Sequence, residues 1–209
     1  AYDIALMSRE LLKHEEIKKY TTIWMDTVRN GEFGLSNTNK LVRFYDGTTG
    51  LKTGYTSAAG HCLSASAKRG GMELIAVVLH CDSSPHRFES AKALLNYGFA
   101  NYALITPQPD EAIGAVPVRL GTQESVTPVL QTDAPVLVDK ALAASAKSTV
   151  QLAEQVTAPV EQGQTLGMLT VKAGDQTLAE IPLVAPEAIP ALTWWDVFLQ
   201  MLKTIATGG

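Results

Sequence analysis

The first hundred residues alternate between patterns typical of helices and of strands. Residues 3–14 keep a helical spacing of apolar positions, and Asp3 is a candidate N-cap. Residues 37–45 have the composition of a strand. Two further strand-like runs, 60–68 and 72–81, flank the turn sequence Arg-Gly-Gly. These two runs predict a β-hairpin.

A long amphipathic helix is expected directly after this hairpin. Ser84 is the predicted cap, Pro85 lies in the first turn, and Gly98 lies near the end of the segment 83–99. The apolar positions that keep helical spacing are Phe88, Ala91, Leu94, Leu95 and Phe99. Together with a strand at 51–56, these elements predict an antiparallel sheet, with the helix (85–97) covering one face.

The pattern changes near residue 103. From Ala103 to Thr193 the chain has no Phe, Tyr or Trp, and nine of its ten prolines lie beyond residue 106. Short alternating segments separated by turn residues predict a small all-β sandwich, with a hairpin at Ala-Gly-Asp-Gln. This region shows no cluster of His, Cys or paired carboxylates, so a spacer or docking module is expected. The predicted domains are 1–103, 104–187 and 188–209.

The last segment, 188–209, predicts an amphipathic helix. Its apolar residues recur every three or four positions, opposite Asp196, Gln200 and Lys203. They are Trp194, Trp195, Phe198, Leu199, Leu202 and Ile205. The apolar part is shorter than the roughly 20 residues that cross a bilayer. Two adjacent Trp favour a helix lying on a membrane surface through residues 192–206, and the alternative is a helix that packs on its own protein.

Composition narrows the function. A hydrophobic fraction of 46% and a charged fraction of 18% are typical of a folded protein. The net charge of −4 and the pI near 5.6 argue against nucleic-acid binding. The two cysteines, Cys62 and Cys81, fit no zinc motif. Across the predicted hairpin they should lie several residues out of register, so two separate thiols are expected.

The stretch Lys52-Thr53-Gly54-Tyr55 combines groups suited to binding an anion. Lys52 supplies a positive charge and Thr53 a hydroxyl donor. Gly54 lacks a Cβ, so a substrate backbone can lie against the strand. The amide of Tyr55 can point at a developing oxyanion. The stretch therefore predicts a site that binds a peptide carboxylate and assists acyl transfer.

The segment 50–99 resembles the end of the catalytic domain of the serine D-alanyl-D-alanine carboxypeptidases, the low-molecular-mass penicillin-binding proteins. The likeness extends upstream through Asn-Thr-Asn-Lys-Leu and Ala1–Leu11, and downstream through 157–171 to the terminal helix. It implies an α+β penicillin-binding/β-lactamase-like (partial) domain with an antiparallel sheet and packed helices. A small all-β sandwich domain and a C-terminal amphipathic helix would follow.

The resemblance also implies roles for individual residues. Lys52, Thr53 and Gly54 fall on the family's third motif, which recognises the terminal carboxylate of the D-Ala-D-Ala stem peptide. Tyr55 matches the residue whose backbone amide completes the oxyanion hole. Arg87 resembles the family arginine near the substrate carboxylate, and its alternative role is a helix-surface charge. Asn37 and Asn39 match a segment near the site, where structural hydrogen bonding is expected of both.

One departure from the family pattern concerns the nucleophile. Neither S-x-x-K nor S-x-N occurs in the 209 residues. The family places both motifs before the position that matches Ala1, so the chain is expected to be the C-terminal part of an enzyme, inactive alone. His61, His80 and His86 are expected to be structural, because no matching carboxylate motif accompanies them.

The implied activity is removal of the terminal D-Ala of peptidoglycan stem peptides, with no metal and no cofactor. β-Lactam antibiotics would acylate the parent protein, and the implied location is the extracytoplasmic face of the bacterial cytoplasmic membrane, as a peripheral protein. The alternative is a non-catalytic wall- or membrane-docking protein with the same fold. A β-lactamase is less suitable, because it would need neither the all-β domain nor the terminal helix.

Overall fold

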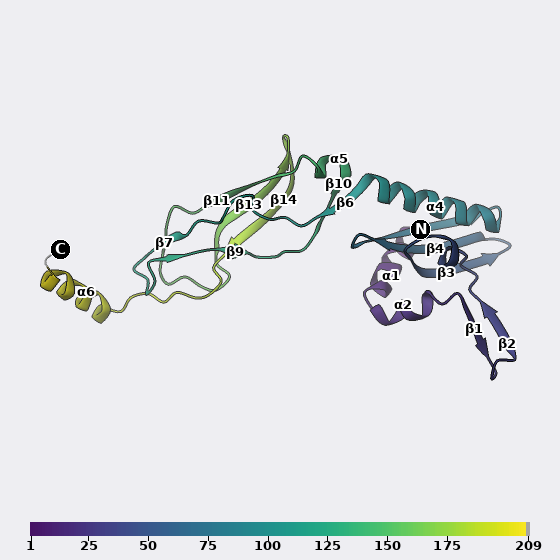
Figure 1. Cartoon of the computed structure of the whole chain (residues 1–209), viewed down its shortest axis with the longest axis horizontal. Helices are drawn as coiled ribbons and strands as arrows, with labels where there is room; N and C mark the ends of the chain where they lie inside the picture. The colour runs from purple at the N-terminus through teal and green to yellow at the C-terminus, as the bar shows by residue number, and fades with distance from the viewer. Residues whose placement is uncertain (208–209) are drawn as a thin grey trace. The chain divides into compact units, whose positions relative to one another are not determined.

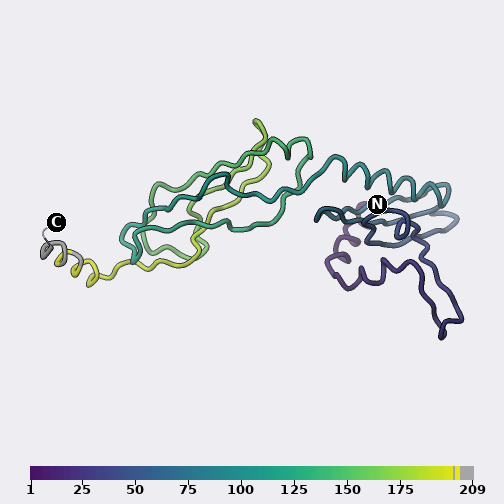
Figure 2. The backbone as a smooth tube through the Cα atoms, viewed as in Figure 1, coloured from purple at the N-terminus to yellow at the C-terminus, as the bar shows by residue number. Residues whose placement is uncertain are grey.

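The computed structural model describes residues 1–207. Contacts between residues divide the chain into two compact units, Ala1–Leu104 and Ile105–Gly209. Figures 1 and 2 trace the chain from the mixed α/β unit at the N-terminus into the β-rich unit that follows. The division into three domains at residues 103 and 187 stays a prediction.

A three-stranded antiparallel sheet organises the first unit. Its strands are β3 (Thr48–Thr56), β4 (Gly60–Arg69) and β5 (Met72–Cys81), in the order β3-β4-β5. The β4–β5 turn uses Gly70 and Gly71 at φ of 54° and 82°, a left-handed conformation that glycine adopts without steric cost. The predicted strands and the predicted hairpin are therefore confirmed.

Helices lie on both faces of this sheet (Figure 1). Helix α4 (Ser84–Asn101) packs on one face, and α1 (Tyr2–Leu12) and α2 (Glu15–Thr21) pack on the other. Side chains of a strand alternate between faces, which explains the sequence of β4. Its apolar residues meet α4 in the core, whereas its serines face α1 and α2. The core of this unit comprises Leu41, Leu63, Ala65, Ala67, Ala76, Val78, Phe88, Ala91 and Leu95.

Helix α4 begins one residue earlier than expected. The cap is Ser83 rather than Ser84, because the Ser83 Oγ accepts a hydrogen bond from the backbone N–H of His86 at 3.3 Å. The Ser84 side chain instead accepts a hydrogen bond from Arg87. Pro85 lies in the first turn as predicted, where its missing N–H costs nothing.

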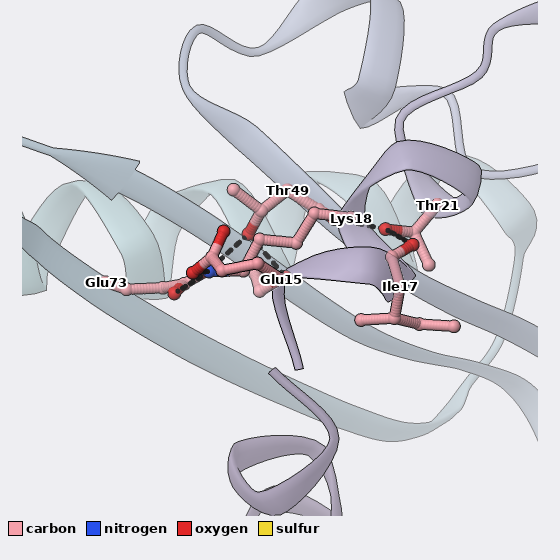
Figure 3. A network of polar contacts seen from close by, with 7 residues as sticks. Glu15, Ile17, Lys18, Thr21, Thr49 and Glu73 are labelled. Atoms are coloured by element: carbon pink, nitrogen blue, oxygen red, sulfur yellow. Dashed lines mark hydrogen bonds and ion pairs between the residues drawn. The ribbon is translucent and has the colours of Figure 1, made fainter. Parts of the chain in front are cut away.

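A polar network ties α2 to the sheet (Figure 3). Lys18 Nζ donates to Glu15 at 2.8 Å and to Glu73 at 2.9 Å. The other Glu73 oxygen accepts from the Thr49 hydroxyl at 2.7 Å. The Thr21 hydroxyl in turn donates to the Thr49 carbonyl at 2.6 Å. The carboxylate of Glu73 thus accepts hydrogen bonds from Lys18 on α2 and Thr49 on β3, which offset the cost of its partial burial.

The segment 37–45 is not a strand, which corrects the prediction. Residues Leu41–Phe44 form the short helix α3. The Asn37 Oδ1 accepts from the Asn39 N–H at 2.9 Å, and the Asn39 Oδ1 accepts from the Leu41 N–H at 3.2 Å. These local bonds from Asn side chains start a helical turn where the apolar pattern suggested an extended chain. The predicted structural role of both asparagines is what the structure shows.

An unpredicted hairpin precedes this segment. Strands β1 (Met25–Val28) and β2 (Phe33–Ser36) pair antiparallel, and all their residues are exposed. The turn contains Asn30-Gly31, both at positive φ, which is a strong hairpin signal.

The two cysteines are closer in register than expected. His61 on β4 pairs with Cys81 on β5, so Cys62 is one residue away from the position opposite Cys81. A bulge between His61 and Leu63 causes this shift in register. Cys81 packs against the core beneath α4, whereas Cys62 opposes Gly54 on the β3 side. Both cysteines are free thiols.

The second unit is built from β-strands. Strand β6 (Tyr102–Ile105) leads into it, one sheet has the order β11-β13-β14-β9, and another has the order β12-β7-β8. The elements are β7 (Val116–Arg119), β8 (Ser125–Val126), β9 (Val129–Leu130), β10 (Val136–Asp139), α5 (Lys140–Ala143), β11 (Lys147–Leu152), β12 (Val156–Thr157), β13 (Thr165–Ala173) and β14 (Gln176–Val184). Its two core clusters consist of Val, Leu, Ile and Ala, as the lack of aromatics predicts. The hairpin at Gly174-Asp175 is confirmed.

The last helix, α6 (Trp194–Thr207), begins at a capping box. The Thr193 Oγ1 accepts from the Asp196 N–H at 3.3 Å, and the Asp196 carboxylate accepts from the Thr193 N–H at 2.8 Å. Hydrogen bonds from Thr193 lower the pKa of Asp196. Among residues 1–207, no helix is long and apolar enough to cross a membrane.

Candidate functional site

The predicted motif lies on β3, an edge strand of the three-stranded sheet. Lys52 pairs with Ser64, Thr53 with Leu63, and Gly54 with Cys62. Alternation along the strand directs Lys52 and Gly54 to the face that carries Ser64, and Thr53 to the α4 face. Lys52 is exposed, whereas Thr53 is only 7% exposed. Within residues 1–207, β3 pairs only with β4, so a ligand that contacts both side chains would lie along the free edge of β3.

The Arg87 side chain contacts this strand from the first turn of α4. Its Nη1 donates to the Gly54 carbonyl at 3.2 Å, and its Nη2 donates to the Ser84 hydroxyl at 3.1 Å. The residue is only 8% exposed, and its Nε has no hydrogen-bond partner. Its guanidinium also lies over the Phe88 ring, 4.9 Å from the centroid. The short connection between β5 and α4 thus positions a cation beside Gly54.

The charge of Arg87 has no acidic partner in the part of the chain that the structure describes. Among residues 1–207, no carboxylate oxygen lies within 4.0 Å of its guanidinium. Removing a guanidinium from water without a counter-charge is costly, so such groups are normally paired. A carboxylate bound at the end of β3 would supply the missing partner.

Thr53 makes a hydrogen bond that the sequence did not predict. Its Oγ1 lies 2.7 Å from the Oγ1 of Thr38, which belongs to the segment before α3. The Lys52 ammonium donates to the backbone carbonyl of Thr53, which holds the Lys52 side chain along the strand. The site therefore brings together two cations, Lys52 and Arg87, and a hydroxyl pair around one short stretch of backbone.

The backbone around Gly54 is open. A Cβ added to Gly54 would meet nothing within 4 Å, so no neighbour in the fold requires a glycine there. Tyr55, the next residue, is 62% exposed, and its ring packs against His61 with centroids 4.4 Å apart. The space beside the Cα of Gly54 is therefore open to close approach by the backbone of a ligand.

The structure brings Thr53, Gly54 and Arg87 into one cluster and places Lys52 beside them on the other face of the strand. Sequence reasoning missed Thr38, because a short polar residue in a loop has no distinctive pattern, and it took Ser84 for the helix cap rather than the partner of Arg87. No group of three or more His, Cys, Asp or Glu suited to a metal occurs within residues 1–207. A cavity in the second unit, lined by Asp110, Glu111 and Ser148 among others, contains none of the predicted site residues.

Comparison with known protein families identifies both units. Residues 1–83 match the family model of D-alanyl-D-alanine carboxypeptidase, and residues 106–191 match the C-terminal domain of penicillin-binding protein 5. The two units thus match, in order, two domains of one family, the D-alanyl-D-alanine carboxypeptidases among the low-molecular-mass penicillin-binding proteins. The predicted family and fold class are confirmed.

Individual relatives agree with this assignment. The chain is 35% identical over 192 residues to the D-alanyl-D-alanine carboxypeptidase DacF of Bacillus subtilis, covering 90% of this chain and 49% of that protein. It is 31% identical over 194 residues to DacD of Escherichia coli, again covering 90% and 49%. The chain thus spans about half the length of the curated relatives it matches.

Solved structures show the same fold. Penicillin-binding protein 5 from Haemophilus influenzae superimposes with a TM-score of 0.73 at 25% identity, covering 90% of this chain and 56% of that one. Penicillin-binding protein 6B from Escherichia coli gives a TM-score of 0.63 at 28% identity, covering 88% and 49%.

Proposed function

We propose that these 209 residues are part of a D-Ala-D-Ala carboxypeptidase and bind the terminal carboxylate of its substrate. The substrate is a peptidoglycan stem peptide ending in D-Ala-D-Ala, as the names of the relatives suggest. The observation that carries this proposal is the buried guanidinium of Arg87, which lies against the Gly54 carbonyl without an acidic partner in residues 1–207. A carboxylate at the free edge of β3 would complete the ion pair.

Each residue of the motif has a distinct role in this proposal. Lys52 and Arg87 supply positive charge, and Thr53 donates a hydrogen bond to the carboxylate. Gly54 lets the peptide backbone lie against β3. The backbone N–H of Tyr55 donates to the oxygen that becomes negative when the scissile carbonyl is attacked. Substrate binding and oxyanion stabilisation would thus come from adjacent residues on one strand.

The reaction is acyl transfer through a serine ester. A serine hydroxyl attacks the carbonyl of the penultimate D-Ala, its proton passes to a base, and the terminal D-Ala leaves as the amine. Water then hydrolyses the ester. Because S-x-x-K is absent from the 209 residues, the nucleophile and its base would come from a part of the enzyme outside them, and this chain alone would be inactive. No step requires a cofactor.

β-Lactam antibiotics are the second ligand class. A penicillin presents a carboxylate and a reactive amide carbonyl at a spacing like that of the D-Ala-D-Ala terminus, so Lys52, Thr53 and Arg87 would orient it in the same way.

Helix α6 is proposed to lie on a membrane surface through residues 192–206. Its large apolar side chains are exposed, including Trp194 at 67% and Trp195 at 61%. Indole rings favour the interface between lipid and water. This arrangement would hold the enzyme as a peripheral protein on the extracytoplasmic face of the bacterial cytoplasmic membrane. The residues 104–187 would then serve as the spacer between site and membrane.

A non-catalytic docking protein with the same fold is the alternative, and the comparisons do not favour it, because the named relatives are carboxypeptidases. Labelling with a fluorescent penicillin separates the two. The complete protein, extended to the length of its relatives, should be labelled stoichiometrically, and the 209-residue chain should not. A complete protein that folds but takes up no label would support the docking protein, and specific labelling of the short chain would contradict the assignment of the nucleophile.

A further inference from the structure

The hydroxyl pair between Thr38 and Thr53 has a consequence for ligand binding. The two Oγ1 atoms lie 2.7 Å apart, and either can be the donor. Each hydroxyl has one proton. If Thr53 donates to Thr38, it has no proton left for a ligand. If Thr38 donates to Thr53, the proton of Thr53 is free to point at a carboxylate.

The segment that carries Thr38 is anchored on both sides. Asn37 donates from Nδ2 to the Ile23 carbonyl at 2.9 Å and from its backbone N–H to the Trp24 carbonyl at 2.8 Å. Asn39 is only 1% exposed, and its Oδ1 accepts from the Leu41 N–H. Thr38 lies between these two fixed residues, so its hydroxyl is held at Thr53 without a large loss of conformational entropy on ligand binding.

We propose that Thr38 is a positioning residue that makes Thr53 a dedicated donor to the ligand carboxylate. Thr38 donates its proton to Thr53 and thereby fixes the rotamer of Thr53. Thr53 then donates to the anion, and the chain of two hydrogen bonds strengthens the second one through mutual polarisation. Thr38 does not touch the ligand itself. This inference rests on the proposed function of the Lys52–Gly54 motif.

The matched variants are Thr38→Val, which keeps the shape and removes the hydroxyl, and Thr38→Ser, which keeps the hydroxyl. The probes are benzylpenicillin and its methyl ester, which share the reactive carbonyl and differ in the carboxylate. The measurement is the second-order rate constant of acylation of the complete protein. Thr38→Val should lower this constant for benzylpenicillin roughly 2- to 12-fold, the effect of one neutral hydrogen bond. With Thr38→Val the methyl ester should react at the wild-type rate, and Thr38→Ser should keep the constants of both probes at their wild-type values.

A general structural role would slow both probes equally, and that result would overturn the proposal. The double variant Thr38→Val/Thr53→Val should be no slower than Thr53→Val alone, because Thr38 acts only through Thr53. If Thr53→Val slows benzylpenicillin selectively but Thr38→Val changes nothing, the role of Thr38 is wrong and the proposed site stands. If Thr53→Val itself has no selective effect, the proposed site fails, and the role of Thr38 fails with it. If thermal unfolding shows that the Thr38→Val variant is destabilised, Thr38→Ala is measured in its place.

Discussion

Gly54→Ala separates a requirement of the fold from a requirement of the ligand. In this structure the added Cβ meets nothing within 4 Å, and Gly54 is not among the glycines with positive φ. The substitution therefore introduces neither a clash nor backbone strain. Because alanine restricts the unfolded chain more than glycine does, the free energy of unfolding should stay the same or rise by up to about 1 kcal/mol.

The effect on ligand binding should be opposite in sign. The new methyl group would stand where the substrate backbone lies against β3. Forcing an extra carbon into a packed contact typically costs about 1–3 kcal/mol, which corresponds to a roughly 5- to 150-fold lower kcat/KM. The variant should therefore be at least as stable as the wild type and clearly less active.

The assay pairs urea denaturation with kcat/KM for a peptide ending in D-Ala-D-Ala, measured on the complete protein. Gly34→Ala is the matched control, because a Cβ at this exposed position in β2 also meets nothing within 4 Å. Its free energy of unfolding should, like that of Gly54→Ala, stay the same or rise by up to about 1 kcal/mol, and its kcat/KM should stay at the wild-type value. Gly47→Ala is the control for a glycine that the fold requires, and it should lower the free energy of unfolding. Its Cβ would lie 2.5 Å from the Lys68 carbonyl oxygen, and its backbone has a φ of 77°. Full activity of Gly54→Ala would refute the idea that a substrate lies against this strand.

Three further predictions concern the α2 network and the terminal helix. Lys18→Met removes the cation that neutralises Glu73, whose side chain is only 20% exposed. Urea denaturation should show a free energy of unfolding roughly 1–3 kcal/mol lower than that of the wild type. An unchanged denaturation midpoint would contradict a stabilising role for this network. The pKa of Lys18 is raised above its usual 10.5, chiefly by the hydrogen bond to Glu15. The stability that charged Lys18 contributes should therefore be fully present below pH 10.5 and be lost as the pH rises through the raised pKa. Replacing both Trp194 and Trp195 by Ala should weaken co-sedimentation with phospholipid vesicles and leave the thermal midpoint unchanged, because both rings are exposed; unchanged sedimentation would argue against a membrane-bound helix.

Local signals predicted much of the fold. The Gly-Gly turn predicted the β4–β5 hairpin, and the serines and Pro85 predicted the start of α4 within one residue. These signals work because they act through the backbone of the same few residues. Short alternating segments between turn residues predicted the β-structure of the second unit, and the lack of aromatic residues predicted its core of Val, Leu, Ile and Ala.

The errors arose where local hydrogen bonds or exposure override the apolar pattern. The segment 37–45 has the apolar content of a strand, but Asn37 and Asn39 bind neighbouring backbone N–H groups and start a helical turn. The hairpin β1–β2 was missed, although its turn contains Asn30-Gly31, because both strands have only four residues and β1 does not alternate between apolar and polar residues.

The candidate site was predicted only in part. The chemistry of Lys52, Thr53 and Gly54 follows from their side chains, but the role of Arg87 came from a family resemblance, since a lone arginine on a helix is usually a surface charge. Its burial and its bond to Gly54 could not be predicted, because they depend on how α4 packs against β3. Thr38 is 15 residues from Thr53 in sequence and approaches it only through the fold.

The central claim is that the end of β3 binds a substrate carboxylate. The most direct test is kcat/KM of the complete protein for a D-Ala-D-Ala peptide, compared among the wild type, Thr53→Ala and Lys52→Ala, with folding checked by thermal melts. Thr53→Ala should lose a hydrogen bond to a charged group, about 1.5–3 kcal/mol, or roughly 10- to 150-fold in kcat/KM. Lys52→Ala should cost at least as much, because it removes a charge aimed at an anion in a partly dry site. If both variants fold and keep wild-type kcat/KM, the Lys52–Gly54 stretch is only a strand edge, and the proposed site is wrong.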